Sequence, residues 1–129
     1  MSLIKMEIRE NEDIYSVLEV VFPKDYHMEG KERKNNIGKD TTTFSVHCDG
    51  VIAACATVTP TDKGFYVRNV AALPEYRRRG LAATLMNYLY KKYQNKLYGV
   101  VDATDEAALQ FYDSLPHIKR YDVVYHSCE

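Results

Sequence analysis

The sequence is poor in cysteine and has no long apolar run. Its cysteines are Cys48, Cys55 and Cys128, an odd number with no Cys-x-x-Cys pair, which indicates neither a disulfide framework nor a zinc site. We therefore expect reduced thiols and no metal. No window approaches the ~18–20 apolar residues that a membrane span needs, and no charged-then-apolar signal segment stands at the N-terminus. These absences predict a soluble, cytoplasmic protein without a membrane partner.

The chain also lacks an excess of charge of either sign. Its formal net charge is −1 and its sequence pI is about 6.4, whereas a domain with general affinity for nucleic acid is expected to be basic. A nucleic-acid partner is therefore not predicted. Internal repeats, low-complexity segments and long linkers are absent as well, and 129 residues are enough to bury one core. We expect residues 1–129 to form a single domain.

The N-terminal part predicts a strand and a helix. Residues 3–8 alternate apolar and polar side chains, as in a half-buried strand. Asn11 then suits the N-cap of a helix that Pro23 ends. The apolar face of this helix contains Ile14, Leu18, Val21 and Phe22. The highly charged residues 24–40 follow as a short irregular helix or a loop.

Three strands are expected next, over residues 43–48, 51–58 and 65–73. The dipeptide Asp49-Gly50 is a strong two-residue hairpin signal, and a second turn is predicted over residues 60–64. The three strands should form an antiparallel meander. The middle strand is almost entirely small or apolar, so we expect it to be central in the sheet.

The C-terminal part alternates helices and strands. A helix is predicted over residues 81–92 with Leu81, Leu85, Tyr88 and Leu89 on one face. A strand over 97–101, a helix over 105–115 closed by Pro116, and a strand over 118–125 follow. This order predicts an α/β (α+β) fold, a mostly antiparallel mixed sheet flanked by helices, with parallel pairing at one point. Parallel strands that diverge leave a cleft between them.

The basic loop Arg77-Arg78-Arg79-Gly80 lies directly before the helix over 81–92. The first N–H groups of a helix have no partners inside it and carry about half a positive charge, so they bind phosphate groups well. Gly80 lets a ligand approach the backbone, and Ala82 keeps the next turn small. A solvated run of surface arginines is the alternative interpretation of the same residues. In a neutral protein, the loop favours a small anionic ligand.

The pattern Arg77-x-x-Gly80-x-Ala82 resembles the acyl-CoA-binding motif of the GNAT superfamily of N-acetyltransferases. A second family segment is similar to Asp105-x-x-Ala108-x-x-Phe111-Tyr112. The resemblance implies a GNAT-like fold whose parallel strand pair forms the CoA cleft, with acetyl-CoA as co-substrate. It implies contacts to the cofactor from Val70, Ala71, Ala72, Arg77, Arg78, Arg79, Gly80, Leu81, Ala82, Ala83, Asp105 and Ala108.

The resemblance further implies direct attack of a primary amine on the thioester through a tetrahedral intermediate. Tyr112 matches the tyrosine that protonates the leaving thiolate in many family members, while Phe111 is expected in the core. The general base is not specified: the candidates are His47, Asp102 and Glu19, and a chain of water molecules is the alternative to a protein base. Cys55 is expected to be a small buried side chain and not a nucleophile.

The sequence departs from the family at Asp105, where the family has asparagine, and at Leu115-Pro116-His117-Ile118, where it has Gly-Phe. Aspartate still caps a helix well but lacks the amide donor. A CoA-binding module without catalysis is therefore the alternative function. The acceptor is a small-molecule or peptide amine that the motifs do not specify. A second subunit could complete its site, which leaves a homodimer open.

Overall fold

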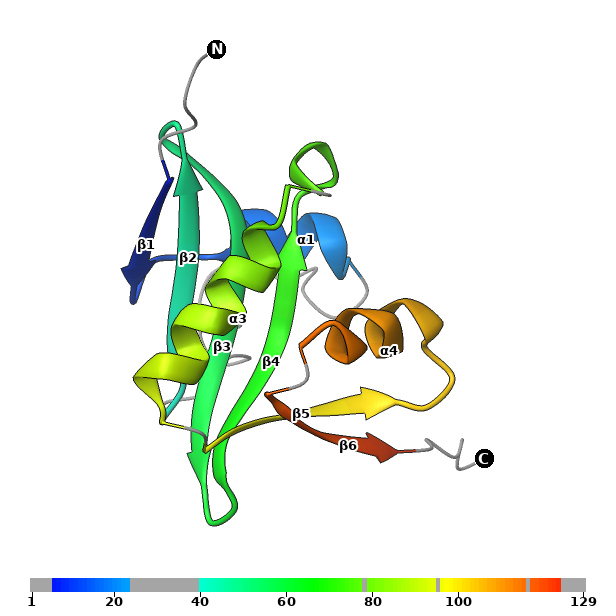
Figure 1. Cartoon of the computed structure of the whole chain (residues 1–129). Coiled ribbons are helices and arrows are strands. Elements are labelled where there is room, and N and C mark those ends of the chain that lie inside the picture. Colours follow the sequence, from blue (N-terminus) through cyan, green and yellow to red (C-terminus); the bar gives the residue numbers. More distant parts are fainter. Residues whose placement is uncertain (1–5, 24–39, 78, 95, 116, 124–129) are drawn as a thin grey trace.

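The computed structural model describes residues 6–23, 40–77, 79–94, 96–115 and 117–123. Within these residues one sheet contains the strands β1 (Met6–Glu10), β2 (Thr42–Cys48), β3 (Val51–Thr61), β4 (Gly64–Ala72), β5 (Leu97–Asp102) and β6 (Lys119–Val123). They lie side by side in chain order (Figure 1). The helices are α1 (Tyr15–Val21), α3 (Leu81–Lys92) and α4 (Glu106–Asp113), with a short 3-10 turn, η1 (Pro74–Tyr76). The predicted α/β class with a mixed sheet is confirmed.

The first four strands pair antiparallel, and β3 is inside the sheet, as predicted. The turn after β2 has positive φ at both Asp49 (51°) and Gly50 (86°), the backbone that an Asp-Gly hairpin favours. The predicted turn over 60–64 is wrong at its start, because β3 continues through Pro60 and Thr61. Proline is tolerated there because it lies near the exposed hairpin tip, where the sheet does not need a main-chain hydrogen bond from this position.

The first strand and the start of the first helix differ from the prediction. β1 runs over Met6–Glu10 and is largely exposed, not half-buried, because it is an edge strand with β2 as its neighbour; residues 3–5 lie outside the described residues. Asn11 is not the N-cap: its φ is 63° and its N–H donates to the Thr43 carbonyl at 2.9 Å. The N-cap residue is Ile14, which has no side-chain cap, and Asp13 Oδ1 accepts the Tyr15 N–H at 3.0 Å. The charged segment 24–40 lies outside the described residues, except Asp40.

The C-terminal half contains two parallel pairs, where one was predicted. β4 and β5 are parallel, and so are β5 and β6. Helix α3 connects the first pair and α4 the second. The second pair arises because the chain crosses over through α4 and lays β6 directly beside β5 in the same direction. The prediction of helix 81–92 is confirmed, and the predicted strand end at Tyr125 and the stop at Pro116 lie outside the described residues.

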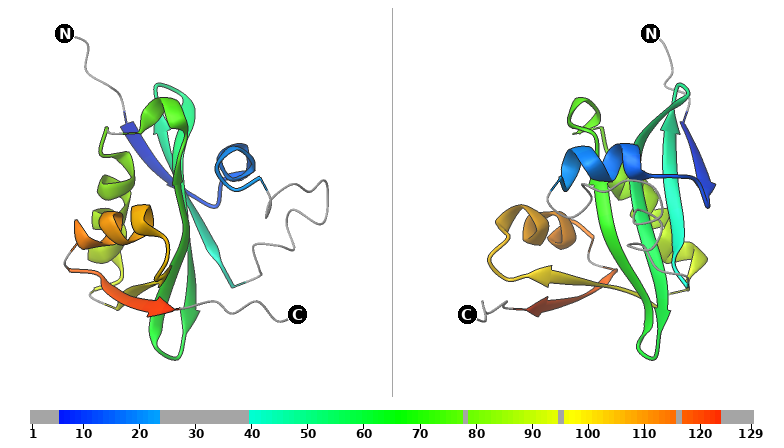
Figure 2. Two further views of the ribbon diagram at one scale, coloured as in Figure 1. Left: turned by 90° about the vertical axis from the view of Figure 1, so that its right-hand side faces the viewer. Right: turned by 180° about the vertical axis from the view of Figure 1, so that it is seen from behind.

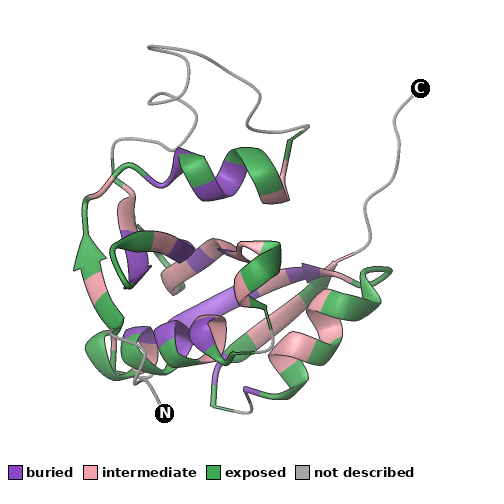
Figure 3. Cartoon of the chain, turned by 90° about the horizontal axis from the view of Figure 1, so that it is seen from above, coloured by how far each residue is buried: buried purple, intermediate pink, exposed green. Residues whose placement is uncertain are grey.

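The two faces of the sheet carry separate layers. Helices α3 and α4 lie on one face and α1 on the other (Figure 2). Buried residues gather along the central strands and on the helix sides that face them (Figure 3). On the α1 side, the buried cluster consists of Ile14, Tyr15, Val17, Leu18, Cys55 and Ala71. Val21 and Phe22 pack against this cluster but stay partly exposed.

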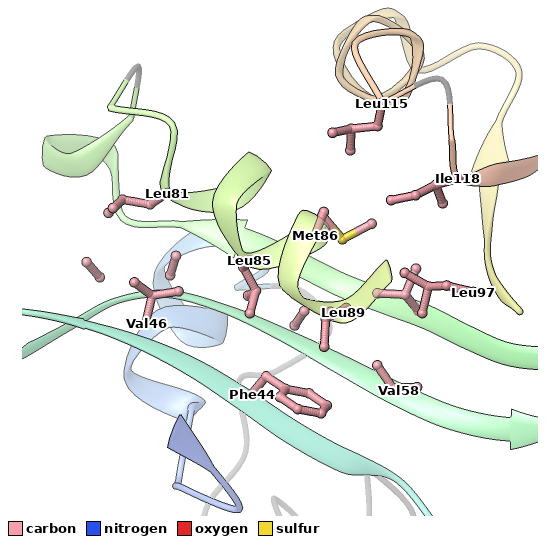
Figure 4. Close-up of a cluster of buried hydrophobic side chains, with 14 of the residues drawn as sticks. Phe44, Val46, Val58, Leu81, Leu85, Met86, Leu89, Leu97, Leu115 and Ile118 are labelled. Carbon is pink, nitrogen blue, oxygen red and sulfur yellow. The ribbon is translucent and has the colours of Figure 1, made fainter. Parts of the chain in front are cut away.

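The larger core lies under α3. Leu85, Met86 and Leu89 are fully buried in one cluster with Phe44, and Leu115 and Ile118 reach the same cluster from the C-terminal part (Figure 4). The predicted buried face of this helix is wrong at Tyr88, which is 38% exposed, and Met86 takes its place. Tyr88 lies at the edge of the buried stripe. Its ring packs edge-on against the Phe44 ring, with 6.3 Å between the two ring centres.

Candidate active site

The sheet opens between β4 and β5. These strands pair at three positions, Phe65–Leu97, Tyr66–Tyr98 and Val67–Gly99. Beyond Val67, β4 follows β3 to Ala72, while β5 follows β6 to Asp102. The two strands therefore separate on the side toward the 77–83 loop. We call this opening the splay; it is the divergence of parallel strands that the sequence predicts.

A cavity of about 250 Å³ lies at the loop end of the splay. It is lined by Ala72, Tyr76, Arg77, Gly80, Leu81, Ala82, Ala83, Phe111 and Ser114. Six of these belong to the predicted cofactor-binding set. Tyr76, Phe111 and Ser114 were not predicted, and Phe111 was expected in the core. Phe111 packs against the main core, as expected, and also lines the cavity.

The N-terminus of α3 forms one wall of this cavity. Gly80 is the N-cap residue with φ 74°, and no side chain caps the helix. A Cβ built on Gly80 would meet nothing within 4 Å, so the glycine is required by its left-handed backbone and leaves open space beside it. Leu81, Ala82 and Ala83 follow directly on the cavity wall. Uncapped first-turn N–H groups beside a cavity are suited to an anion.

The arginines of the loop have different partners. The Arg77 Nε donates to the Ala72 carbonyl at 3.3 Å and so ties the loop back to the end of β4. The Arg79 guanidinium lies 5.3 Å from the centre of the Tyr76 ring, a cation–π contact. Arg78 lies outside the described residues. Both described guanidinium groups add positive charge around the cavity.

Tyr112 lies over the narrow end of the splay. Its ring packs against the main core, and its hydroxyl-bearing edge stands over Gly99, the last residue of β5 that pairs with β4. Burial, with a smaller contribution from the nearby Tyr66 phenol, raises the pKa of Tyr112 to about 12. The phenol is therefore protonated at neutral pH and available as a hydrogen-bond donor.

These features match a known family over most of the chain. The sequence matches the family described as Acetyltransferase (GNAT) family over residues 11–115. The chain belongs to this acetyltransferase family. Comparison with curated proteins gives no match.

Solved GNAT structures share the fold at low sequence identity. One is a GNAT family acetyltransferase from Elizabethkingia anophelis with acetyl-CoA bound: TM-score 0.68, 17% identity, 85% of this chain and 74% of that chain covered. Another is the ribosomal-protein-S18-alanine N-acetyltransferase from Escherichia coli, with a TM-score of 0.69 and 24% identity; the match covers 86% of this chain and 76% of that chain. A third is AAC(6')-Iy in complex with the bisubstrate analog CoA-S-monomethyl-acetylneamine, with a TM-score of 0.74 and 15% identity; the match covers 97% of this chain and 99% of that chain.

Some residues of the GNAT motifs lie away from the cavity. Val70 packs against the main core, and Ala71 is buried on the α1 side, so neither side chain lines the cavity. Asp105 is the N-cap of α4, where its Oδ1 accepts the Ala108 N–H at 3.1 Å. The predicted capping role of Asp105 is confirmed. The hydrogen bond between Asp105 and Ala108 therefore stabilises the N-terminal end of α4, the helix that contains Tyr112.

The predicted base candidates of this GNAT chain differ in their surroundings. Hydrogen bonds from the Thr104 N–H and hydroxyl lower the pKa of Asp102, which makes its carboxylate a weaker proton acceptor. His47 lies on β2, three strand spacings or about 14 Å from β5. Glu19 is exposed on α1, on the other face of the sheet. Within the described residues, no group of three His, Cys, Asp or Glu side chains could hold a metal ion.

Proposed function

We propose that the protein binds acetyl-CoA and transfers its acetyl group to a primary amine. The observation that carries the proposal is the cavity at the uncapped N-terminus of α3, because it joins a helix end suited to phosphate to the splay that leads to Tyr112. Family membership supports the same chemistry. So do the structural neighbours, two of which carry acetyl-CoA or a CoA-based analog.

The pyrophosphate of the cofactor fits the helix end of the cavity. Its negative charge would accept hydrogen bonds from the N–H groups of Leu81, Ala82 and Ala83, which lie on the cavity wall. The helix dipole contributes about half a positive charge at this point. The Arg77 and Arg79 side chains add charge without blocking the helix end, because both fold back onto the loop.

The acetyl group would lie in the splay, against the edge of β4 that β5 has left. Acetyl-CoA supplies the thioester. The amine nitrogen forms a bond with the carbonyl carbon, and the bond from that carbon to sulfur breaks. Main-chain N–H groups of β4 can stabilise charge on the carbonyl oxygen, because an open strand edge presents them to the splay.

Tyr112 would donate a hydrogen bond to the departing sulfur. Burial raises the pKa of the phenol to about 12, so its O–H is present to stabilise the negative charge that develops on sulfur. We infer that Tyr112 stabilises the departing sulfur through this O–H and that the thiolate takes its proton from the phenol or from solvent.

The amine must lose a proton before or during the attack. Asp102 is a weakened acceptor and His47 is remote, so we assign this proton to water. The acceptor itself is a primary amine on a small molecule or a peptide. The printed names of the neighbours include an alanine N-acetyltransferase and aminoglycoside acetyltransferases, and a primary amine is the chemistry that these acceptors share.

The test begins with calorimetric titration of acetyl-CoA into the purified protein. At a ligand concentration of about 100 times the dissociation constant, the fold should gain roughly 2.7 kcal/mol and the melting temperature should rise by several degrees. Release of free CoA thiol is then measured with a panel of amines. Binding together with turnover supports the proposal, whereas binding without turnover of any amine would favour the CoA-binding module. Absence of binding would overturn both.

A further inference from the structure

Strand β4 contains one extra residue near the narrow end of the splay. Thr57 of β3 pairs with Arg68, and Cys55 pairs with Ala71. Between these pairs β3 contributes one residue, whereas β4 contributes two, Asn69 and Val70. This is a β-bulge with its first residue in the left-handed region, since φ of Asn69 is 56°. It begins two residues after Val67, which forms the last pair between β4 and β5 with Gly99.

Two buried side chains of β3 bind the main chain of this bulge. The Thr57 hydroxyl donates to the Arg68 carbonyl at 3.0 Å and accepts from Asn69 Nδ2 at 3.2 Å. The Cys55 thiol donates to the Asn69 carbonyl, with 3.5 Å between sulfur and oxygen. Both side chains are 0% exposed. We call this pair the bulge clamp.

The clamp determines where the neighbouring N–H groups point. A peptide unit is planar and trans, so its N–H is directed opposite to its C=O. The Arg68 carbonyl points to Thr57 and the Asn69 carbonyl points to Cys55, both on β3. The N–H groups of Asn69 and Val70, which belong to the same two peptide units, must then point away from β3. That direction leads into the splay.

We propose that Thr57 and Cys55 are positioning residues that orient the Asn69 and Val70 N–H groups toward the carbonyl oxygen of the acetyl group. This inference rests on the proposed function, because it needs an acetyl thioester in the splay. Neither side chain touches the substrate. A buried polar group needs a partner, and here the Thr57 hydroxyl and the Cys55 thiol each donate to a main-chain carbonyl at the bulge.

The matched variants are Thr57→Val and Thr57→Ser. Valine keeps the shape of threonine and removes the hydroxyl, whereas serine keeps the hydroxyl and removes a methyl group. We expect Thr57→Val to lower kcat by about tenfold to a hundredfold, because the donors stay in place but lose their exact orientation. The Kd for acetyl-CoA should change by less than about threefold, since the phosphate contacts of α3 stay intact. Thr57→Ser should keep kcat near the wild-type value.

A readout without turnover is the amide resonances of Asn69 and Val70 in the NMR spectrum of the free protein. They should shift in Thr57→Val more than in Thr57→Ser. Cys55→Ala and Cys55→Ser form a second matched pair, used if Thr57→Val does not fold. Equal kcat and equal amide shifts in the valine and serine variants, or in the alanine and serine variants of Cys55, would overturn the clamp. Failure of the wild-type protein to turn over acetyl-CoA would instead overturn the proposed function, and the amide shifts would still decide the clamp.

Discussion

Gly99 makes room for Tyr112. A Cβ built on Gly99 would lie 2.7 Å from Cε1 of the Tyr112 ring and 2.9 Å from both its Cζ and its hydroxyl oxygen. Gly99 does not have a positive φ, so its backbone would accept any residue, and the space above it is what requires glycine. The smallest side chain on β5 thus allows the phenol of α4 to lie directly on the sheet, at the point where β4 and β5 part.

Gly99→Ala should therefore lower turnover through Tyr112. The ring must move by roughly 0.5–1 Å to reach an ordinary contact distance, and a displacement of this size in a catalytic group reduces kcat by tenfold or more, up to about a hundredfold. Affinity for acetyl-CoA should stay near the wild-type value. The kcat of Gly99→Ala, Tyr112→Phe and the double variant is measured. In the Tyr112→Phe background, which already lacks the hydroxyl, we expect Gly99→Ala to lower kcat very little further. If the two substitutions instead reduced kcat by independent factors that multiply in the double variant, this coupling would be contradicted.

Tyr112→Phe alone should reduce kcat and leave acetyl-CoA affinity almost unchanged. The phenol donates its hydrogen bond only as sulfur charge develops, so its loss affects the transition state more than the bound ground state. Because the pKa of Tyr112 is about 12, loss of its proton should not reduce turnover of the wild-type protein across the neutral and mildly alkaline range. Steady-state kinetics over that range, with calorimetric Kd values, test both statements. A kcat equal to that of the wild type would remove Tyr112 from the mechanism.

Gly80→Glu should abolish acetyl-CoA binding. The substitution places a carboxylate at the helix end where the pyrophosphate would lie. Gly50→Glu is a matched control, because Gly50 also has a positive φ (86°, against 74° for Gly80) and also has nothing within 4 Å of a built Cβ. Both variants should lose about 1–2 kcal/mol of stability from the left-handed backbone. Calorimetry should find binding retained in Gly50→Glu; retained binding in Gly80→Glu would refute the phosphate site.

Asp105→Ala should destabilise the protein by about 1 kcal/mol, because it removes the cap of α4. Asp105→Asn should be close to neutral in stability, since asparagine caps as well as aspartate. Urea denaturation measures both. The asparagine variant also restores the residue found in the GNAT motif. A loss of stability as large in Asp105→Asn as in Asp105→Ala would show that the charge, and not the hydrogen bond, stabilises the helix.

Stability should fall at alkaline pH because of buried acidic groups. Burial raises the pKa of the Cys55 thiol from 9.0 to about 12, so the folded protein holds this proton more tightly than the unfolded chain does. The resulting stabilisation is complete below pH 9 and is lost as the pH rises toward 12. Tyr112 acts in the same direction between 10 and about 12. Cys55→Ser should flatten the decline in unfolding free energy, measured by urea denaturation from about pH 7 to pH 10.5. An unchanged slope would contradict the assignment.

Local patterns predicted the elements well where a residue's own conformation decides the structure. Asp49-Gly50 forms the expected hairpin because both residues accept positive φ, and helix α3 starts where expected because Gly80 precedes it in the left-handed region. Asn11 misled the prediction, since its side chain suits a cap but its main chain is held by Thr43. Here the contact between β1 and β2 outweighs the local preference.

The site was predictable only in its contiguous part. The loop residues that line the cavity are neighbours in the sequence and resemble a motif, whereas Tyr76, Phe111 and Ser114 reach it through packing of the 3-10 turn and α4 against α3. The role of Gly99 depends on Tyr112, which lies on another element, and the bulge depends on two strands in register. A glycine in the middle of an apolar strand was the one local signal that something approaches closely there.

The short seam between β4 and β5 has a mechanical consequence. The two parts of the sheet are joined there by three residue pairs, while the unit β5-α4-β6 also leans on α3 through Leu115 and Ile118 (Figure 4). Three residue pairs supply few main-chain hydrogen bonds, so the attachment of this unit to the antiparallel strands depends largely on its apolar contacts with α3. Under the proposed function, a cofactor lying across the splay would contact both parts of the sheet and add to the few contacts that join them.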